Sequence, residues 1–199
     1  MSQQELLIHV AAALDRAGID YMITGSIVSS LQGEPRLTHD IDVVLAIRRD
    51  QIPSVMEAFA EPRFYLDSRA AEEAIRTSGM FNAIDAVDGG KIDFWVLRDE
   101  PFDRSRFQRK YSERLFGEDV QVSTPEDTIL AKLWWARLSG GSEKYFQDAL
   151  RVYEVQSPGI DDAYLDKWAR HLEVEEFLGR IREGSRTKPG QPPRGSDDP

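Results

Sequence analysis

The sequence has no cysteine and no long apolar run, and these two absences exclude several classes of protein. Without cysteine among its 199 residues, the chain has neither a disulfide framework nor a thiolate metal site. No stretch approaches the ~20 apolar residues of a membrane-spanning helix. The N-terminus lacks the basic start and apolar run of a signal peptide. We therefore expect a cytoplasmic protein without a membrane partner, in which any metal is held by carboxylates or histidines.

Positive charge is also scarce. The chain carries 25 lysines and arginines against 35 acidic residues, a formal net charge of −10. Such a field opposes unaided, non-specific attraction to nucleic acid. Apolar residues make up 41% and charged residues 30%, which are ordinary proportions for a globular protein. The length suits one domain, or one domain with a small appended lobe.

The first half of the sequence alternates between helix and strand patterns. Apolar residues recur at helical spacing near the N-terminus, and further on they alternate with polar residues in short runs, as in strands. The last two runs flank Asp88-Gly89-Gly90, a turn signal typical of a hairpin. These patterns predict helices over 4–17, 27–31 and 51–59, and strands over 21–24, 40–47, 81–87 and 91–97.

The second half is mostly helical in pattern, after one short apolar run at 119–123. Thr124 precedes a proline and two acids, which favours a helix start because the threonine can cap the helix and the acids match its dipole. The final residues are mostly proline, glycine, serine and charged. We expect helices over 125–137, 143–155 and 161–181, with an α/β core over 1–117, a helical C-terminal lobe over 118–183 and a disordered tail over 184–199.

Three aspartates interrupt otherwise apolar strands. Asp40 and Asp42 are two residues apart, so their side chains leave the same face of one strand, with Cα atoms roughly 6.5 to 7 Å apart. Asp93 lies on a later strand, and it joins the other two if that strand pairs beside 40–47. Adjacent carboxylates repel each other unless a cation neutralises them, and oxygen ligands suit Mg²⁺ or Mn²⁺. The pattern predicts a divalent-metal site.

Gly25-Ser26 follows the first predicted strand and precedes a short helix. A glycine lets the backbone approach a phosphate closely, and the start of a helix presents free N–H groups to it. Two divalent ions beside such a phosphate can stabilise an in-line displacement at phosphorus, a reaction that needs few other side chains. Each motif alone has an ordinary structural explanation, so the inference depends on their joint order.

Taken together, Gly25-Ser26, Asp40-Ile41-Asp42 and Asp93 resemble the signature of the DNA polymerase beta-type nucleotidyltransferase superfamily. The finer texture is most similar to its AbiEii-like toxin branch, on the segments Thr24-Gly25-Ser26, Arg36-Leu37-Thr38-His39-Asp40-Ile41-Asp42 and Lys91-Ile92-Asp93-Phe94. The resemblance spans roughly residues 5 to 155. It implies a small mixed twisted sheet with flanking helices as the catalytic core, followed by a helical lobe.

The same resemblance implies a reaction and two more site residues. The reaction is transfer of a nucleoside monophosphate from a nucleoside triphosphate (NTP) to an acceptor, with release of pyrophosphate. Lys132 stands where such proteins place a lysine for the triphosphate, and Asp148 stands where they place a supporting aspartate. Acceptors of related proteins include tRNA ends and protein hydroxyls, and a toxin of this branch has an antitoxin or regulator as its partner.

Two alternatives stay open. The first is a catalytically inactive nucleotide-binding or regulatory module, against which the presence of all three acids argues. The second is a nucleotidyltransferase with a small-molecule acceptor such as an antibiotic, for which an acidic acceptor groove is expected.

Two further features have competing interpretations. Trp134-Trp135 could stack on a base, or pack in the core. A basic run could guide an RNA acceptor or simply face solvent, and it comprises Arg104, Arg106, Arg109, Lys110 and Arg114.

Overall fold

The structure, a computed structural model, describes residues 1–38 and 40–187. His39 and residues 188–199 lie outside the described part. Most of the predicted disordered tail is therefore not described. Residues 184–187, which we assigned to that tail, form the end of helix α9 (Glu175–Thr187), where a Cβ atom added at Gly184 would lie 3.6 Å from the Leu150 side chain.

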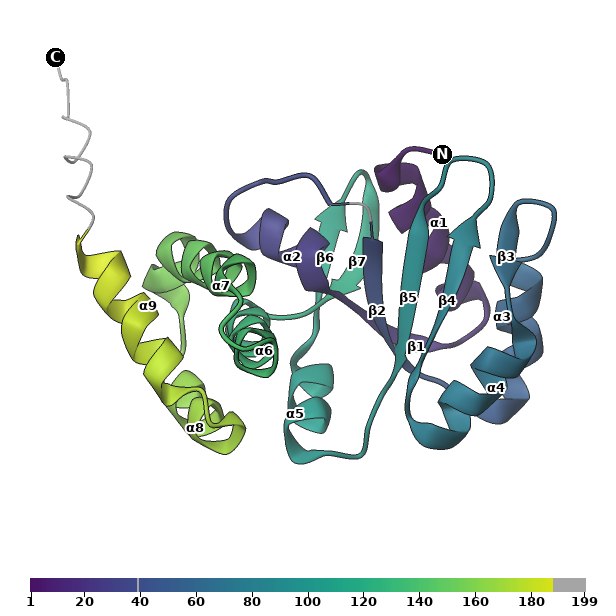
Figure 1. The fold of residues 1–199 in the computed structure, drawn as a ribbon. Helices are drawn as coiled ribbons and strands as arrows, with labels where there is room; N and C mark the ends of the chain where they lie inside the picture. The colour runs from purple at the N-terminus through teal and green to yellow at the C-terminus, as the bar shows by residue number, and fades with distance from the viewer. Residues whose placement is uncertain (39, 188–199) are drawn as a thin grey trace, which may run out of the picture.

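The described residues form a mixed α/β fold built on one seven-stranded sheet (Figure 1). Its strand order is β3-β4-β5-β2-β1-β7-β6, with the neighbours β2 and β5, and β1 and β7, parallel and the other pairs antiparallel. The strands are β1 (Asp20–Thr24), β2 (Asp40–Ala46), β3 (Phe64–Leu66), β4 (Met80–Asp85), β5 (Lys91–Val96), β6 (Tyr111–Leu115) and β7 (Glu118–Val122).

Helices flank this sheet and then gather beyond it. Figure 1 shows α6 to α9 together on one side of the molecule, with α3 and α4 on the opposite side. The helices are α1 (Gln3–Arg16), α2 (Gly25–Gln32), α3 (Ile52–Ala58), α4 (Ser68–Thr77), α5 (Pro101–Arg109), α6 (Pro125–Leu138), α7 (Glu143–Gln156), α8 (Asp162–Leu172) and α9. No helix in the described ranges is both long enough and apolar enough to cross a membrane.

The predicted mixed α/β fold is confirmed, but β3, α4, α5 and β6 were not predicted, and one predicted run has a different place. The run 118–122, which we grouped with the helical lobe, lies in the sheet, where Val122 pairs with Ile23 of β1. It does so because Val120 and Val122 alternate onto the buried face. The charged stretch after residue 100 contains helix α5, which we did not predict.

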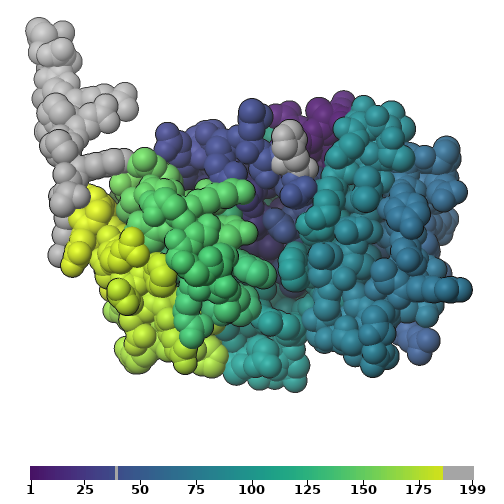
Figure 2. Space-filling model, in the orientation of Figure 1, coloured from purple at the N-terminus to yellow at the C-terminus, as the bar shows by residue number. Residues whose placement is uncertain are grey.

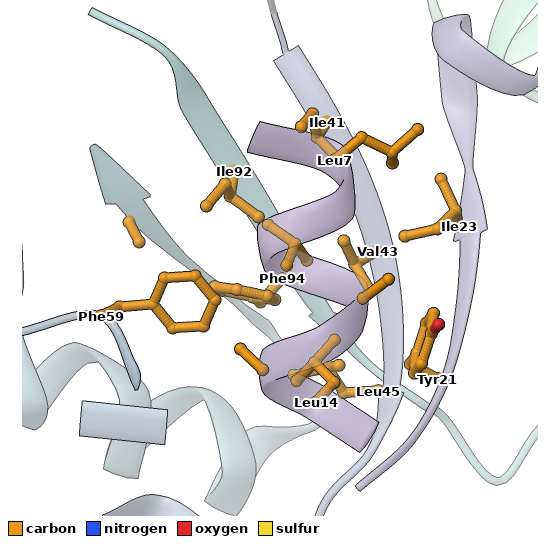
Figure 3. Packing of buried hydrophobic residues seen from close by; sticks show 14 of the residues in the cluster. Leu7, Leu14, Tyr21, Ile23, Ile41, Val43, Leu45, Phe59, Ile92 and Phe94 are labelled. Carbon is orange, nitrogen blue, oxygen red and sulfur yellow. The ribbon is translucent and has the colours of Figure 1, made fainter. Parts of the chain in front are cut away.

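One face of the sheet carries the main hydrophobic core. Leu7 and Leu14 of α1 pack over the central strands, as Figure 3 shows. Ile41, Val43 and Leu45 of β2 point into this core, together with Phe94 of β5 and Tyr21 of β1. The remaining residues of these strands alternate onto the other face, which leaves that face available to hold polar groups.

The helices α6 to α9 have a separate core. Its buried residues include Leu133 on α6, Val152 on α7, Trp168 on α8 and Ile181 on α9. The start of α6 is capped as predicted, since the Thr124 hydroxyl accepts a hydrogen bond from the backbone N–H of Asp127 at 3.3 Å. The sheet and these helices therefore have separate cores, and polar side chains lie where the two meet.

Candidate active site

The parallel pairing of β2 and β5 brings the predicted aspartates together. Asp42 and Asp93 are direct register partners, and Asp40 faces Lys91 two pairs away. The prediction that the Asp93 strand lies beside the Asp40 strand is therefore confirmed. Asp93 is buried, whereas Asp40 at the strand start is exposed. The three carboxylates share the face opposite the main core.

These carboxylates are incompletely neutralised by the protein. Lys91 Nζ lies 2.8 Å from Asp93 Oδ2, while the buried Asp93 Oδ1 has no hydrogen-bond partner among residues 1–38 and 40–187. The Trp95 indole donates to Asp42 Oδ1 at 3.4 Å. Burial raises the pKa of Asp42, and the neighbouring Asp93 charge adds to that rise. A carboxylate that is costly to ionise beside a second one fits a site for a divalent cation.

No group of three or more potential ligand side chains in 1–38 and 40–187 is arranged around a common metal position. Lys91 instead occupies one oxygen of Asp93. The donor set still suits a hard cation, because it offers carboxylate oxygens, including one without a partner. Asp40, Asp42 and Asp93 are the residues that would hold such an ion.

Gly25 lies against the Asp42 carboxylate. A Cβ atom at Gly25 would come within 2.0 Å of Asp42 Oδ2, and its φ of +73° is one that residues with a side chain rarely adopt. Ser26 follows in the first turn of α2, whose N-cap Thr24 makes no side-chain capping hydrogen bond. The N-terminal N–H groups of α2 are therefore placed near the aspartates, as phosphate binding requires.

Ser26 is joined to the helical part by a charged network. Arg36 donates to both carboxylate oxygens of Asp148 at 2.8 Å and to Ser26 Oγ at 2.8 Å. Lys132 Nζ lies 2.8 Å from Asp148 Oδ2 and 3.3 Å from Ser26 Oγ. The structure thus brings Ser26, Lys132 and Asp148 together, three positions singled out from the sequence.

Arg36 is the member of this network that we did not single out. It stands in the loop after α2, four residues before Asp40, where no helical or strand pattern assigns a face to it. Its one signal in the sequence is its place in the run that leads to the paired aspartates. In the structure it forms an ion pair with Asp148 and donates a hydrogen bond to Ser26 Oγ.

Burial and hydrogen bonding together set the pKa values of Lys132 and Asp148. Burial lowers the pKa of Lys132, against the opposing effect of its hydrogen bond to Asp148. Burial also disfavours the charged form of Asp148, but hydrogen bonds from Arg36 and Lys132 outweigh it and hold the pKa of Asp148 below its usual value. Asp148 is thus the counter-charge that keeps a lysine beside Ser26 in a buried position.

A cleft of about 420 Å³ joins these groups. It runs between the sheet and α6, on the face of the molecule shown in Figure 2. The three aspartates, Gly25-Ser26 and Lys132 all line it. Trp95, Trp134 and Trp135 line it too, so neither member of the Trp134-Trp135 pair is confined to the core. Its size is in the range of small-molecule and cofactor sites.

The basic run after residue 103 is not a free cationic surface. Each of its members forms an ion pair with an acid: Arg104 with Asp99, Arg106 with Asp103, Arg109 with Glu126, Lys110 with Asp20 and Arg114 with Asp119. Charge that is neutralised in this way attracts a polyanion weakly. The run therefore gives little support to an RNA-guiding role.

The fold is the one found in nucleotidyltransferases, as comparison with known proteins shows. Residues 6–88, less than half of the chain, match the family model described as aminoglycoside-2''-adenylyltransferase. No curated protein matches the sequence. This partial match agrees with the expected nucleotidyltransferase resemblance, whereas the AbiEii-like branch stays a prediction.

Three solved structures are similar over most of their length. An antigenic nucleotidyltransferase-like protein from Paracoccidioides brasiliensis matches with a TM-score of 0.58 and 16% identity, covering 90% of this chain and 91% of that one. The antibiotic-resistance factor ANT(2'')-Ia matches at 0.55 and 13%, covering 93% and 96%. The lincosamide antibiotic adenylyltransferase LnuA matches at 0.52 and 10%, covering 78% and 98%. The chain has the nucleotidyltransferase fold, and the family match with these neighbours supports a nucleotidyltransferase.

Proposed function

We propose that this protein is a metal-dependent nucleotidyltransferase that moves a nucleoside monophosphate from an NTP to an acceptor hydroxyl. The observation that carries the proposal is the register of β2 and β5, which sets Asp42 beside Asp93. Because Gly25 has no side chain, its backbone can lie against the Asp42 carboxylate. Asp40, Asp42 and Asp93 would hold Mg²⁺ or Mn²⁺, which would offset the charge of the phosphates.

The remaining residues bind and orient the triphosphate. The N-terminus of α2 and the Ser26 hydroxyl offer hydrogen-bond donors, and Lys132 adds a positive charge on the opposite wall. Asp148 and Arg36 keep Lys132 and Ser26 in place. In the reaction the acceptor oxygen bonds to the α-phosphorus as the bond to the departing pyrophosphate breaks. Such a transfer depends mainly on position and charge, which these residues provide.

Two acceptor classes are supported by different observations. The motif texture around Gly25-Ser26 and the aspartates favours a tRNA or protein hydroxyl, in a toxin controlled by an antitoxin. The family-model match over 6–88, together with the fold shared with antibiotic adenylyltransferases, favours a small-molecule acceptor. Both use the same site and the same transfer.

The test is a labelling assay with one substitution in the site and one outside it. The purified protein is incubated with each labelled NTP and Mg²⁺, and with total tRNA, a cell lysate, tobramycin or lincomycin. We expect Asp42→Asn to lower labelling by at least about a hundredfold, because a lost metal ligand removes several kcal/mol of transition-state stabilisation. Asp50→Asn is the matched control, since Asp50 is exposed and pairs only with Arg48 in the structure described.

Equal labelling by Asp42→Asn and the unaltered protein would show that the aspartates do not hold the catalytic metal. Nucleotide binding without labelling of any acceptor, with any NTP, would instead identify an inactive binding module.

A further inference from the structure

Beyond the aspartates, the cleft ends in a group of tryptophans. Three of the four tryptophans in the chain line it. The ring centroids of Trp95 and Trp135 are 5.9 Å apart and those of Trp134 and Trp135 are 5.6 Å apart. Trp135 is 38% exposed, and its side chain lines the cleft. These open indole faces can stack a planar ring.

A guanidinium group lies beside these rings. The Arg98 Cζ atom is 5.2 Å from the centroid of Trp134. Its Nε donates to Asp103 at 2.8 Å, and the side chain stays 43% exposed. Arg106 pairs with the other oxygen of the same buried Asp103 at 2.7 Å. Two guanidinium groups therefore share one carboxylate, and this end of the cleft keeps a net positive charge.

The other charged side chains that line the cleft are also mostly positive. Apart from the three aspartates that would hold the metal, the described residues lining the cleft include one acid, Asp103. The bases among them are Arg98, Arg106, Lys132 and Lys144. An aminoglycoside acceptor carries several ammonium groups and needs acidic partners, which this wall does not supply once the aspartates hold metal.

The geometry of the proposed reaction places the acceptor at the tryptophan end of the cleft. Under the proposed function, Ser26 and Lys132 hold the leaving pyrophosphate on the β1 side of the aspartates. In an in-line displacement the attacking oxygen enters from the opposite side. That side is β5, where Trp95 lies two residues after Asp93 and Arg98 follows the strand end.

We propose that Arg98, Trp134 and Trp135 form an acceptor subsite that selects a planar ring carrying negative charge and rejects polycations. This inference rests on the proposed nucleotidyltransferase function. A nucleotide unit has the required chemistry, since its base can stack on indole and its phosphate can pair with a guanidinium. The unit can belong to a free nucleotide or to the end of an RNA chain.

Two small probes with the same ring and opposite charge test the subsite directly. Phenyl phosphate and the trimethylanilinium cation are titrated into the ¹⁵N-labelled protein, and the indole N–H signals of the tryptophans are followed. Phenyl phosphate is expected to bind more tightly and to shift the signals of Trp134 and Trp135. Trp168, buried in the helical core, is the internal control. Equal binding of the cation would overturn the proposal without any substitution.

Substitutions then locate the charge. Arg98→Gln removes one charge-assisted hydrogen bond and is expected to weaken phenyl phosphate binding about tenfold. Asp103 keeps Arg106 as its partner in this variant. Arg104→Gln is the matched control, because Arg104 is an exposed neighbour paired with Asp99 outside the cleft. An unchanged affinity in Arg98→Gln would place the probe elsewhere and overturn the proposal.

Transfer assays separate the subsite from the proposed function. With labelled NTP and Mg²⁺, a free nucleoside monophosphate and a short RNA are offered beside tobramycin. Labelling of either nucleotide acceptor, reduced about tenfold in kcat/KM by Arg98→Gln, supports the subsite and identifies its source. Labelling of tobramycin alone overturns it. If the probes bind as expected but no acceptor is labelled, the binding subsite is upheld and the transferase function fails.

Discussion

Gly25 lies where a side chain has no room. Its backbone has a positive φ, and an added Cβ would overlap the Asp42 carboxylate. The same close approach leaves backbone N–H groups of α2 next to the aspartates. The glycine thus links the turn proposed to bind phosphate to the strand proposed to bind metal. Its two constraints, conformation and space, can be separated by experiment.

We predict that Gly25→Ala abolishes metal-dependent activity while costing only part of the stability. The left-handed conformation costs an alanine about 1 to 2 kcal/mol, and the overlap displaces Asp42 from its position. Gly89→Ala is the matched control, because Gly89 has φ +75° but nothing within 4 Å of an added Cβ. Thermal unfolding and Mn²⁺ titration measure the two effects. Similar loss of Mn²⁺ binding in both variants would contradict the prediction.

The sequence pattern singles out the three aspartates and Gly25-Ser26, but not all of the residues that the structure places against them. The aspartates stand out because each is a charged residue within a mostly apolar strand pattern, namely Asp40, Asp42 and Asp93. Arg36 and Arg98 have no such signal, since both lie outside regular elements in which a periodic pattern would place them. Arg36 meets Asp148 through tertiary packing, and Arg98 meets Asp103 across the turn into α5, so no periodic pattern predicts either pair.

At the scale of elements, the hydrophobic pattern predicted the helices and strands whose apolar residues recur at regular spacing. The β4–β5 hairpin and the capped helix α6 were expected, and both were found. Helix α5 was not, because only Phe102, Asp103 and Phe107 of its nine residues are buried and the rest are mostly polar. Arg106 pairs with Asp103 within the helix, and Arg109 pairs with Glu126 of α6. A helix whose exposed positions are held by ion pairs and whose buried positions are few gives a weak periodic signal.

The contact among α5, α6 and α8 depends on the buried Asp127. The Tyr164 hydroxyl of α8 donates to Asp127 Oδ1 at 2.7 Å and lies 3.0 Å from the Ser105 hydroxyl of α5. We predict that Tyr164→Phe lowers the free energy of unfolding by about 2 kcal/mol, the contribution of a hydrogen bond to a charged group. Tyr65→Phe is the control, since Tyr65 is exposed on the edge strand β3. Urea unfolding measures both.

The same substitution has a pH dependence of known sign. Burial raises the pKa of Asp127, while hydrogen bonds from Tyr164 and Thr124 oppose that rise. A raised folded-state pKa means that stability falls as pH increases from the usual value of 3.8 through the folded value. Loss of the Tyr164 hydroxyl raises that pKa further. The stability lost in Tyr164→Phe is therefore larger near neutral pH than near pH 4, and a cost independent of pH would contradict this account.

For the whole molecule, the two cores meet mainly through polar side chains. The side-chain amide of Gln32 in α2 donates to the Ser123 backbone carbonyl at 2.7 Å. The backbone carbonyl of Gln32 accepts from the side-chain amide of Gln156 in α7 at 2.8 Å. Arg36 reaches from the sheet side to Asp148 on α7. The cleft follows this junction. A ligand that touches both Ser26 and Lys132 would therefore strengthen the contact between the two parts.

We predict that an NTP analogue stabilises the protein only when a divalent metal is present. At a concentration 100 times its Kd, a ligand adds about 2.7 kcal/mol, which corresponds to a rise in Tm of roughly 5 to 10 °C for a chain of this size. The metal is required because the triphosphate must lie beside three carboxylates. Lys132→Met should reduce the rise, since it removes the contact on the helical wall. An equal rise in Tm in the presence of a chelator would show that the nucleotide binds away from Asp40, Asp42 and Asp93.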